Sequence, residues 1–146
     1  MSERFKLNGA GKAVLKSMYA VHGELEKGPL DTRILELVRL QSSYMNGCAF
    51  CLKMHSDASR KAGLSDDLII QMGAWHECHL IDEKDKAALT WTEAVLTCAH
   101  PDDQQEAYDA AGEHWSAEER EYLAWAAAEI SAWNRIMIAS GQVAPK

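Results

Sequence analysis

Two cysteines and a histidine are the residues whose types and spacing could do chemistry in this sequence. Cys48 and Cys51 are three residues apart, and His55 follows Cys51 by four. On a helix this spacing places both thiols and the imidazole on one face, with neighbouring Cβ atoms about 5–6 Å apart. Such thiols can cross-link, and the imidazole can accept a thiol proton. The segment therefore predicts redox or nucleophilic sulfur chemistry.

The surroundings of Cys48 favour a reactive thiol. Cys48 directly follows Gly47, at the predicted start of a helix, where unpaired N–H groups and the helix dipole lower a thiol pKa. An uncharged run of 13 residues, from Leu40 to Leu52, predicts a shielded pocket around the pair. Because desolvation raises a thiol pKa, the helix terminus and His55 must offset it if the cysteine is to react near neutral pH.

Glu36 is the carboxylate that we expect to serve His55. It precedes Asn46, the centre of a predicted turn, by ten residues, so an antiparallel return brings it level with residue 56. A carboxylate facing His55 gives a proton relay, in which the imidazole takes the thiol proton and the carboxylate orients the imidazole. The alternative is a surface carboxylate that pairs with Arg39 at i,i+3.

The elements that must position these residues are helices. Apolar residues recur at helical spacing along nearly the whole chain, beginning with Leu7 in the first segment, and strand signals are missing. The helix that carries the motif is predicted to run from about Cys48 to Gly63, and Ser116 with Glu119 forms a capping box that opens the last helix. We therefore expect an all-α bundle of about seven helices, in a single domain over residues 1–146.

Composition excludes several classes of function. The formal net charge is -7 and no basic cluster interleaves with aromatic residues, so we expect no nucleic-acid partner. No apolar run is long enough for a membrane span and no signal peptide precedes the first helix, which predicts a soluble cytoplasmic protein. Four cysteines do not make a secreted disulfide framework. A chain of 146 residues has no room for a separate cofactor domain, and we expect no cofactor.

The motif resembles that of the alkylhydroperoxidase AhpD-like family, within the carboxymuconolactone decarboxylase superfamily. The resemblance is carried by a pattern of residues and by two later segments, and it covers roughly residues 30–140. The pattern consists of Glu36, Arg39, the stretch Asn46-Gly47-Cys48-Ala49-Phe50-Cys51, and His55; the later segments are 88–94 and 133–136.

The resemblance implies a thiol peroxidase. Cys51 would attack a hydroperoxide and become a sulfenic acid, Cys48 would condense with it to a disulfide, and Glu36 with His55 would relay protons. A dithiol donor, either a lipoyl protein or a thioredoxin-like protein, would restore the thiols. A homo-oligomer built from dimers, such as a hexamer, is also implied. The best-known member carries a histidine between its cysteines where this chain has Ala49 and Phe50, so its donor and its peroxide preference do not transfer.

Phe50, Met54 and Trp75 are candidates for the mouth of the pocket, where they would favour an organic hydroperoxide over hydrogen peroxide. Two other interpretations of the cysteines stay open. In the first, Cys48, Cys51 and His55 bind zinc, with Cys78 or His79 as the fourth ligand. In the second, the cysteines only pack as small buried side chains.

Two other functions are also compatible with the scaffold. One is a decarboxylase or lactone-processing enzyme, although such relatives generally lack the paired cysteines. The other is a non-enzymatic redox sensor or partner-binding protein, in which the disulfide switches an interface. Turnover of a hydroperoxide distinguishes the peroxidase from both.

Overall fold

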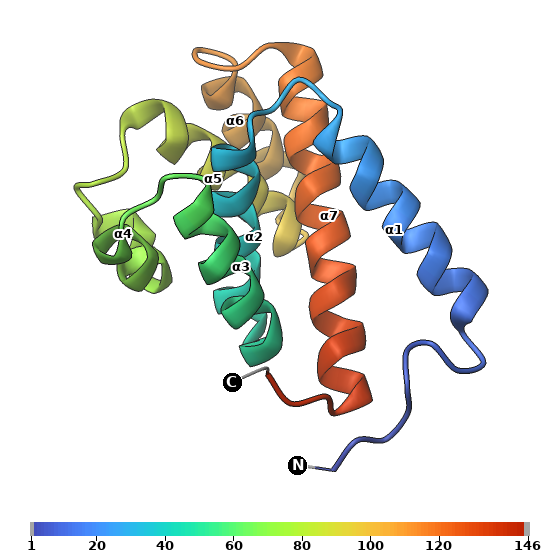
Figure 1. Cartoon of the computed structure of the whole chain (residues 1–146). Coiled ribbons are helices and arrows are strands. Elements are labelled where there is room, and N and C mark those ends of the chain that lie inside the picture. The colour runs from blue at the N-terminus through green and yellow to red at the C-terminus, as the bar shows by residue number, and fades with distance from the viewer. Residues whose placement is uncertain (1, 145–146) are drawn as a thin grey trace.

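The computed structural model describes residues 2–144, and over this range the protein is an all-helical bundle without strands (Figure 1). The expected fold class and helix number are confirmed. No helix among these residues is long and apolar enough to cross a membrane. The helices are α1 (Lys12–Glu26), α2 (Thr32–Asn46), α3 (Ala49–Lys61), α4 (Asp66–Gln71), the 3₁₀ helix η1 (Met72–Glu77), α5 (Glu83–Leu96), α6 (Pro101–Ala111) and α7 (Ala117–Ser140).

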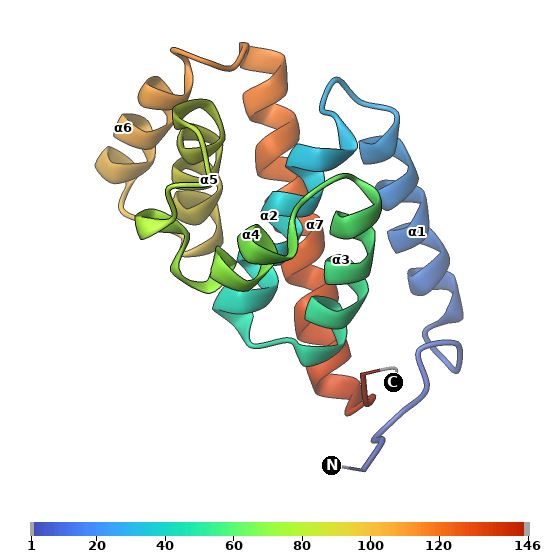
Figure 2. The ribbon, with the colours of Figure 1, turned by 60° about the vertical axis from the view of Figure 1, so that its left-hand side comes forward.

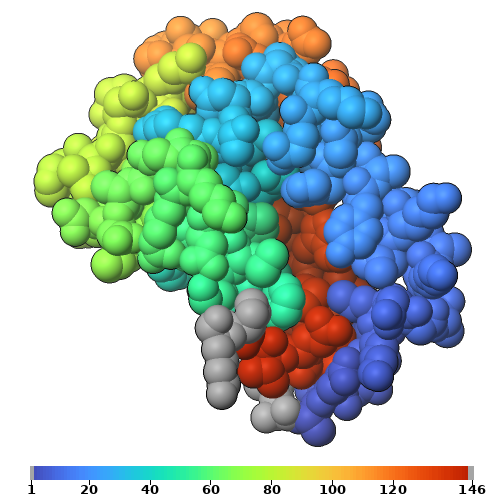
Figure 3. Space-filling view, viewed as in Figure 1, coloured from blue at the N-terminus to red at the C-terminus, as the bar shows by residue number. Residues whose placement is uncertain are grey.

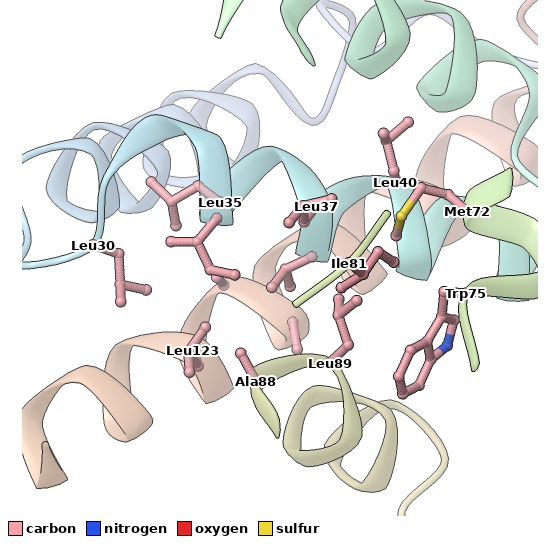
Figure 4. Packing of buried hydrophobic residues seen from close by; sticks show 14 of the residues in the cluster. Leu30, Leu35, Leu37, Leu40, Met72, Trp75, Ile81, Ala88, Leu89 and Leu123 are labelled. Carbon is pink, nitrogen blue, oxygen red and sulfur yellow. The ribbon is translucent and has the colours of Figure 1, made fainter. Parts of the chain in front are cut away.

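Helix α2 is the centre of the bundle. It packs against α3, α5 and α7, and the two ribbon views show it surrounded by them (Figures 1 and 2). Every residue from Ile34 to Ser43 is buried as a result. In the main core, leucines of α2 meet Leu89 of α5 and Leu123 of α7 (Figure 4). Glu36 and Arg39 lie within this buried stretch, so the packing of α2 fixes their positions.

The connection between α2 and α3 forms the predicted antiparallel hairpin. Gly47 ends α2 in a left-handed conformation, with φ 67° and ψ 34°, which glycine adopts without strain. Cys48 then caps the N-terminus of α3. The predicted helix started one residue too early and ended at Gly63 instead of Lys61, within the usual uncertainty of helix ends.

The N-terminal segment crosses the C-terminal end of α7 before α1 begins. The Arg4 N–H donates to the carbonyl of Ser140 at 2.7 Å, and its guanidinium donates to the carbonyls of Ile138 and Ala139. These bonds satisfy carbonyls that the end of a helix leaves unpaired. The expectation that Leu7 belongs to the first helix is wrong, because α1 begins only at Lys12; Leu7 instead packs against the cysteines.

Helix α1 lies at the edge of the bundle, beside α7. Leu25, near its C-terminal end, is its only buried residue. The space-filling view shows the surface hollowed between α3 in green, α7 in red and α1 in blue (Figure 3). This hollow is where the candidate site lies.

Candidate active site

Cys48 and Cys51 are joined by a disulfide at the N-terminus of α3. Their Cα atoms are 5.3 Å apart, a separation that disulfides commonly span. The Cys48 sulfur accepts a hydrogen bond from the Cys51 N–H at 3.3 Å. Both residues are buried in a small cluster with Met137, and Leu7 and Phe50 pack against it. The predicted dithiol is therefore present in its oxidised form, at a helix terminus that stabilises a thiolate once the bond is reduced.

His55 meets Glu36 as the hairpin predicts. Its Nδ1 lies 2.9 Å from Oε2 of Glu36, and that carboxylate is only 3% exposed. An ionised carboxylate can only accept, so Nδ1 carries the proton of this hydrogen bond. The other ring nitrogen, Nε2, then keeps its lone pair and can take up a proton. Because His55 follows Cys51 by one turn of α3, the imidazole is on the same side of the helix as the sulfur.

Arg39 binds the other oxygen of Glu36. Its Nη1 lies 2.7 Å from Oε1, and its Nη2 lies 2.7 Å from Glu26 of α1. Burial alone would raise the pKa of Glu36, but the hydrogen bonds and charges of His55 and Arg39 outweigh it and hold that pKa below its ordinary value. Glu36 thus has both predicted partners. It is a buried anion rather than a surface carboxylate.

A second acid–base group, which the sequence analysis missed, lies beside the first. Nδ1 of His22 is 3.1 Å from Oε1 of Glu129, and the Trp133 indole N–H donates to the same oxygen at 2.6 Å. The His22 side chain is 38% exposed and lies between Glu129 and Arg39. One signal could have identified the group, since Glu129 is the only charged residue between Glu121 and Arg135.

Both groups line one cavity of about 900 Å³, which is in the size range of small-molecule sites. It lies among α1, α2, α3 and α7. Cys51 lines it, whereas Cys48 does not. Cys51 is thus the cysteine that a molecule in the cavity can reach first. The lining includes Tyr19, His22 and Glu26 of α1, Glu36 and Arg39 of α2, Cys51, His55 and Lys61 of α3, and Glu129, Trp133 and Met137 of α7.

Of the three candidates for the pocket mouth, Phe50 and Met54 line the cavity and Trp75 does not. Trp75 is buried in the main core near Leu89 (Figure 4), and its indole N–H donates to Glu93 at 3.1 Å. The expectation for Trp75 is therefore corrected. The physical reason is that η1 packs against α2 and α4, and helical spacing alone does not reveal which neighbour a tryptophan will meet.

The structure does not bring Cys78, a candidate fourth zinc ligand, to Cys48, Cys51 and His55. Cys78 is buried in the main core, whereas Cys48 and Cys51 belong to the separate cluster at α3. Within residues 2–144, no three Cys, His, Asp or Glu side chains are arranged to hold a metal ion.

Comparison with known proteins defines the family. Residues 12–94 match the carboxymuconolactone decarboxylase family. The chain belongs to this family. It is 31% identical to the uncharacterised protein YdfG of Bacillus subtilis over 141 residues, which cover 97% of this chain and 96% of YdfG.

Solved structures identify the chain as an AhpD-like member of that family. One is a protein of unknown function from Agrobacterium tumefaciens, whose name suggests an AhpD antioxidant defence protein; it aligns with a TM-score of 0.94, 31% identity and 99% of both chains. Another is a peroxidase-related protein from Ralstonia eutropha with an alkylhydroperoxidase AhpD core. Its TM-score is 0.83 over 96% of this chain and 74% of that one, at 18% identity, so it shows the shared fold alone.

Proposed function

We propose that this protein is a thiol-dependent peroxidase that reduces organic hydroperoxides through a dithiol/disulfide cycle. One observation carries the proposal. Cys51, which forms a disulfide with Cys48, lines a cavity large enough for a small molecule. The buried carboxylate of Glu36 and the imidazole of His55, which are hydrogen-bonded to each other, line the same cavity. Family membership and the AhpD-like structural neighbours agree with this chemistry.

The first step of the proposed cycle takes place at Cys51. Its thiol transfers a proton to Nε2 of His55, and the thiolate attacks the outer oxygen of R–O–O–H. The O–O bond breaks, Cys51 becomes a sulfenic acid, and the imidazolium returns the proton to the leaving alkoxide, which departs as R–OH. Glu36 stabilises the imidazolium that forms transiently, since its lowered pKa keeps it ionised.

The second step closes the disulfide seen in this structure. The Cys48 thiol attacks the sulfur of the Cys51 sulfenic acid, and water leaves. A dithiol donor then reduces the disulfide, and the donor is itself oxidised to a disulfide. A lipoyl or thioredoxin-like protein supplies such a dithiol. The short distance between Cys48 and Cys51 supports formation of the disulfide between them, because their Cα atoms are 5.3 Å apart.

The two alternative functions account for less of the site. A decarboxylase would use the cavity and its acid–base groups but has no need of a disulfide. A redox sensor would use the disulfide but needs neither a cavity of about 900 Å³ nor a carboxylate–imidazole pair beside it. A peroxidase uses all three features.

Single-turnover kinetics on cysteine variants test the proposal. Pre-reduced protein is mixed with cumene hydroperoxide by stopped flow, and thiols are counted before and after. We expect wild type to lose two thiols per chain and Cys51→Ser to lose at least 99% of the rate. Cys48→Ser should still consume one equivalent of peroxide and stall as a sulfenic acid, which a dimedone label detects.

Cys98→Ser is the matched control, since Cys98 is an exposed free cysteine outside the cavity. It should behave as wild type. Equal loss of rate in Cys48→Ser and Cys51→Ser would contradict the assigned order of attack. A pre-reduced wild type that does not consume hydroperoxide at all would exclude the peroxidase and leave the redox sensor and the decarboxylase.

A further inference from the structure

The end of the cavity formed by His22, Glu129 and Trp133 has no part in the proposed cycle, yet it holds a buried carboxylate, that of Glu129, between two partly exposed side chains. We propose that this end, the Glu129 subsite, binds a hydrogen-bond donor on the organic part of the substrate, either a hydroxyl or an amino group. The hydroperoxide group would then lie at Cys51. Only that orientation rests on the proposed function, because the subsite itself requires no turnover.

The spacing along α7 sets the shape of the ligand. Glu129, Trp133 and Met137 follow one another at intervals of four residues, and all three line the cavity. At 1.5 Å per residue, Glu129 lies about 12 Å along the helix axis from Met137. Met137 packs against the two cysteines. A molecule that spans the cavity from Cys51 to Glu129 is therefore elongated, with an apolar middle that lies against Trp133.

The carboxylate of Glu129 has one oxygen that no hydrogen-bond donor of the described residues reaches. It is 4% exposed, and its Oε1 already accepts from His22 and Trp133. Its Oε2 is buried and has no hydrogen-bond partner among the described residues. A buried acceptor without a partner is destabilising, and a donor in the cavity that Glu129 lines would supply the missing bond. No residue of the proposed peroxidase cycle needs this oxygen.

The charges around the cavity select among ligand groups. Three carboxylates line it, those of Glu26, Glu36 and Glu129, and its permanent cations are Arg39 and Lys61. Arg39 is already bonded to Glu26 and Glu36, so it does not offset the charge of Glu129. A ligand carboxylate at this end would meet a like charge in a buried setting, whereas a neutral or cationic donor would not. The subsite is thus expected to reject anionic groups.

Calorimetric titration of the disulfide form tests the subsite without catalysis. The probes are derivatives of cumyl alcohol, the reduced product of cumene hydroperoxide, with a para-hydroxymethyl, para-methoxymethyl or para-carboxyl group. The methoxymethyl compound lacks the donor and carries one additional methyl group, and the Glu129 variant described next separates these two effects. We expect the hydroxymethyl compound to bind about tenfold more tightly than the methoxymethyl compound, as one hydrogen bond to a charged group provides. The carboxyl compound should bind most weakly.

If the subsite is correctly assigned, Glu129→Gln abolishes the preference for the hydroxymethyl compound over the methoxymethyl compound. The amide keeps the shape and an oxygen for His22 and Trp133, but it places an N–H₂ donor where Oε2 lies, so the methoxymethyl compound should now bind at least as tightly as the hydroxymethyl compound. Glu121→Gln, an exposed position on the same helix, should retain the wild-type preference. Thermal unfolding verifies that both variants fold.

The outcomes separate this inference from the peroxidase function. Equal binding of the hydroxymethyl and methoxymethyl compounds to wild type overturns the subsite, even if cumene hydroperoxide is turned over. A tenfold preference in a protein that does not consume hydroperoxide supports the subsite and overturns the peroxidase. Equal binding to wild type overturns the subsite even if Glu129→Gln does not fold, and a preference that a folded Glu129→Gln variant retains would come from the additional methyl group and would overturn it as well.

Discussion

The two clusters of buried apolar side chains in this protein differ in how they are held. The main core is continuous across α2, α5 and α7 and includes Leu37 and Leu89, both fully buried. The cluster at the disulfide contains Cys48, Cys51 and Met137, borders a cavity, and is covered from one side by Leu7 of the N-terminal segment. Dense apolar packing therefore stabilises the scaffold, whereas the site is stabilised by fewer apolar contacts together with buried charged side chains.

The largest expected effect is on stability in the main core. Leu89→Ala should lower the free energy of unfolding by about 2–5 kcal/mol, because it leaves a void among well-packed neighbours. Met137→Ala is the matched change at the disulfide cluster and should cost less, since one side of Met137 already faces the cavity. Urea denaturation measures both. Equal losses would mean that the two clusters are held alike.

The second-largest expected effect is on the stability that the buried charge of Glu36 provides. Glu36→Gln should lower the free energy of unfolding by about 1–3 kcal/mol at neutral pH, because Arg39 and His55 lose a charged partner. The folded-state pKa of Glu36 lies below the ordinary value of 4.5, so its stabilisation is complete above that pH and is lost as the pH falls through the folded-state pKa.

The pH dependence of that variant provides the test. Urea denaturation from neutral pH to about pH 3 should show the Glu36→Gln and wild-type curves converging in acid. The deficit of Leu89→Ala should stay nearly constant over the same range, because no ionisable group is removed. A Glu36→Gln deficit that is independent of pH would show that Glu36 contributes shape rather than charge.

The smallest effect concerns the N-terminal segment over the disulfide. A thiolate must approach a sulfur atom to reduce the bond, and both sulfur-bearing residues are buried. Arg4→Ala removes the two guanidinium hydrogen bonds to the end of α7 and should raise the rate of disulfide reduction by dithiothreitol about threefold, with little change in thermal stability. Lys6→Ala, an exposed change in the same segment, should leave the rate unaltered. A slower or unchanged rate in Arg4→Ala would show that the segment does not limit access.

Local rules were sufficient where neighbours in sequence are neighbours in space. The contact between Glu36 and His55 followed from counting back from a tight turn, and it is present at 2.9 Å. The capping box of Ser116 and Glu119 was likewise predicted and is confirmed. Both depend on helix geometry within one hairpin or one turn. The homo-oligomer and the dithiol donor concern contacts with other molecules, and both stay predictions.

The same rules failed where distant segments meet. Leu7 was assigned to a helix by its spacing, but the hydrogen bonds of Arg4 to α7 hold this segment out of α1. Trp75 was placed at the pocket mouth, although it packs in the main core. The contact between His22 and Glu129 was missed, because nothing in the local sequence shows that α1 brings His22 to a residue 107 positions away.

The sequence by itself determined the all-helical architecture, the dithiol at a helix terminus and the carboxylate that serves its histidine. These follow from helical periodicity, a glycine turn and the short loop between α2 and α3. Only the tertiary structure decided that Cys51 rather than Cys48 lines the cavity, and that Glu129 and His22 face the same space. The physical reason is that helix periodicity fixes which side chains share a face, whereas the packing of α1 and α7 around α2 determines which faces meet.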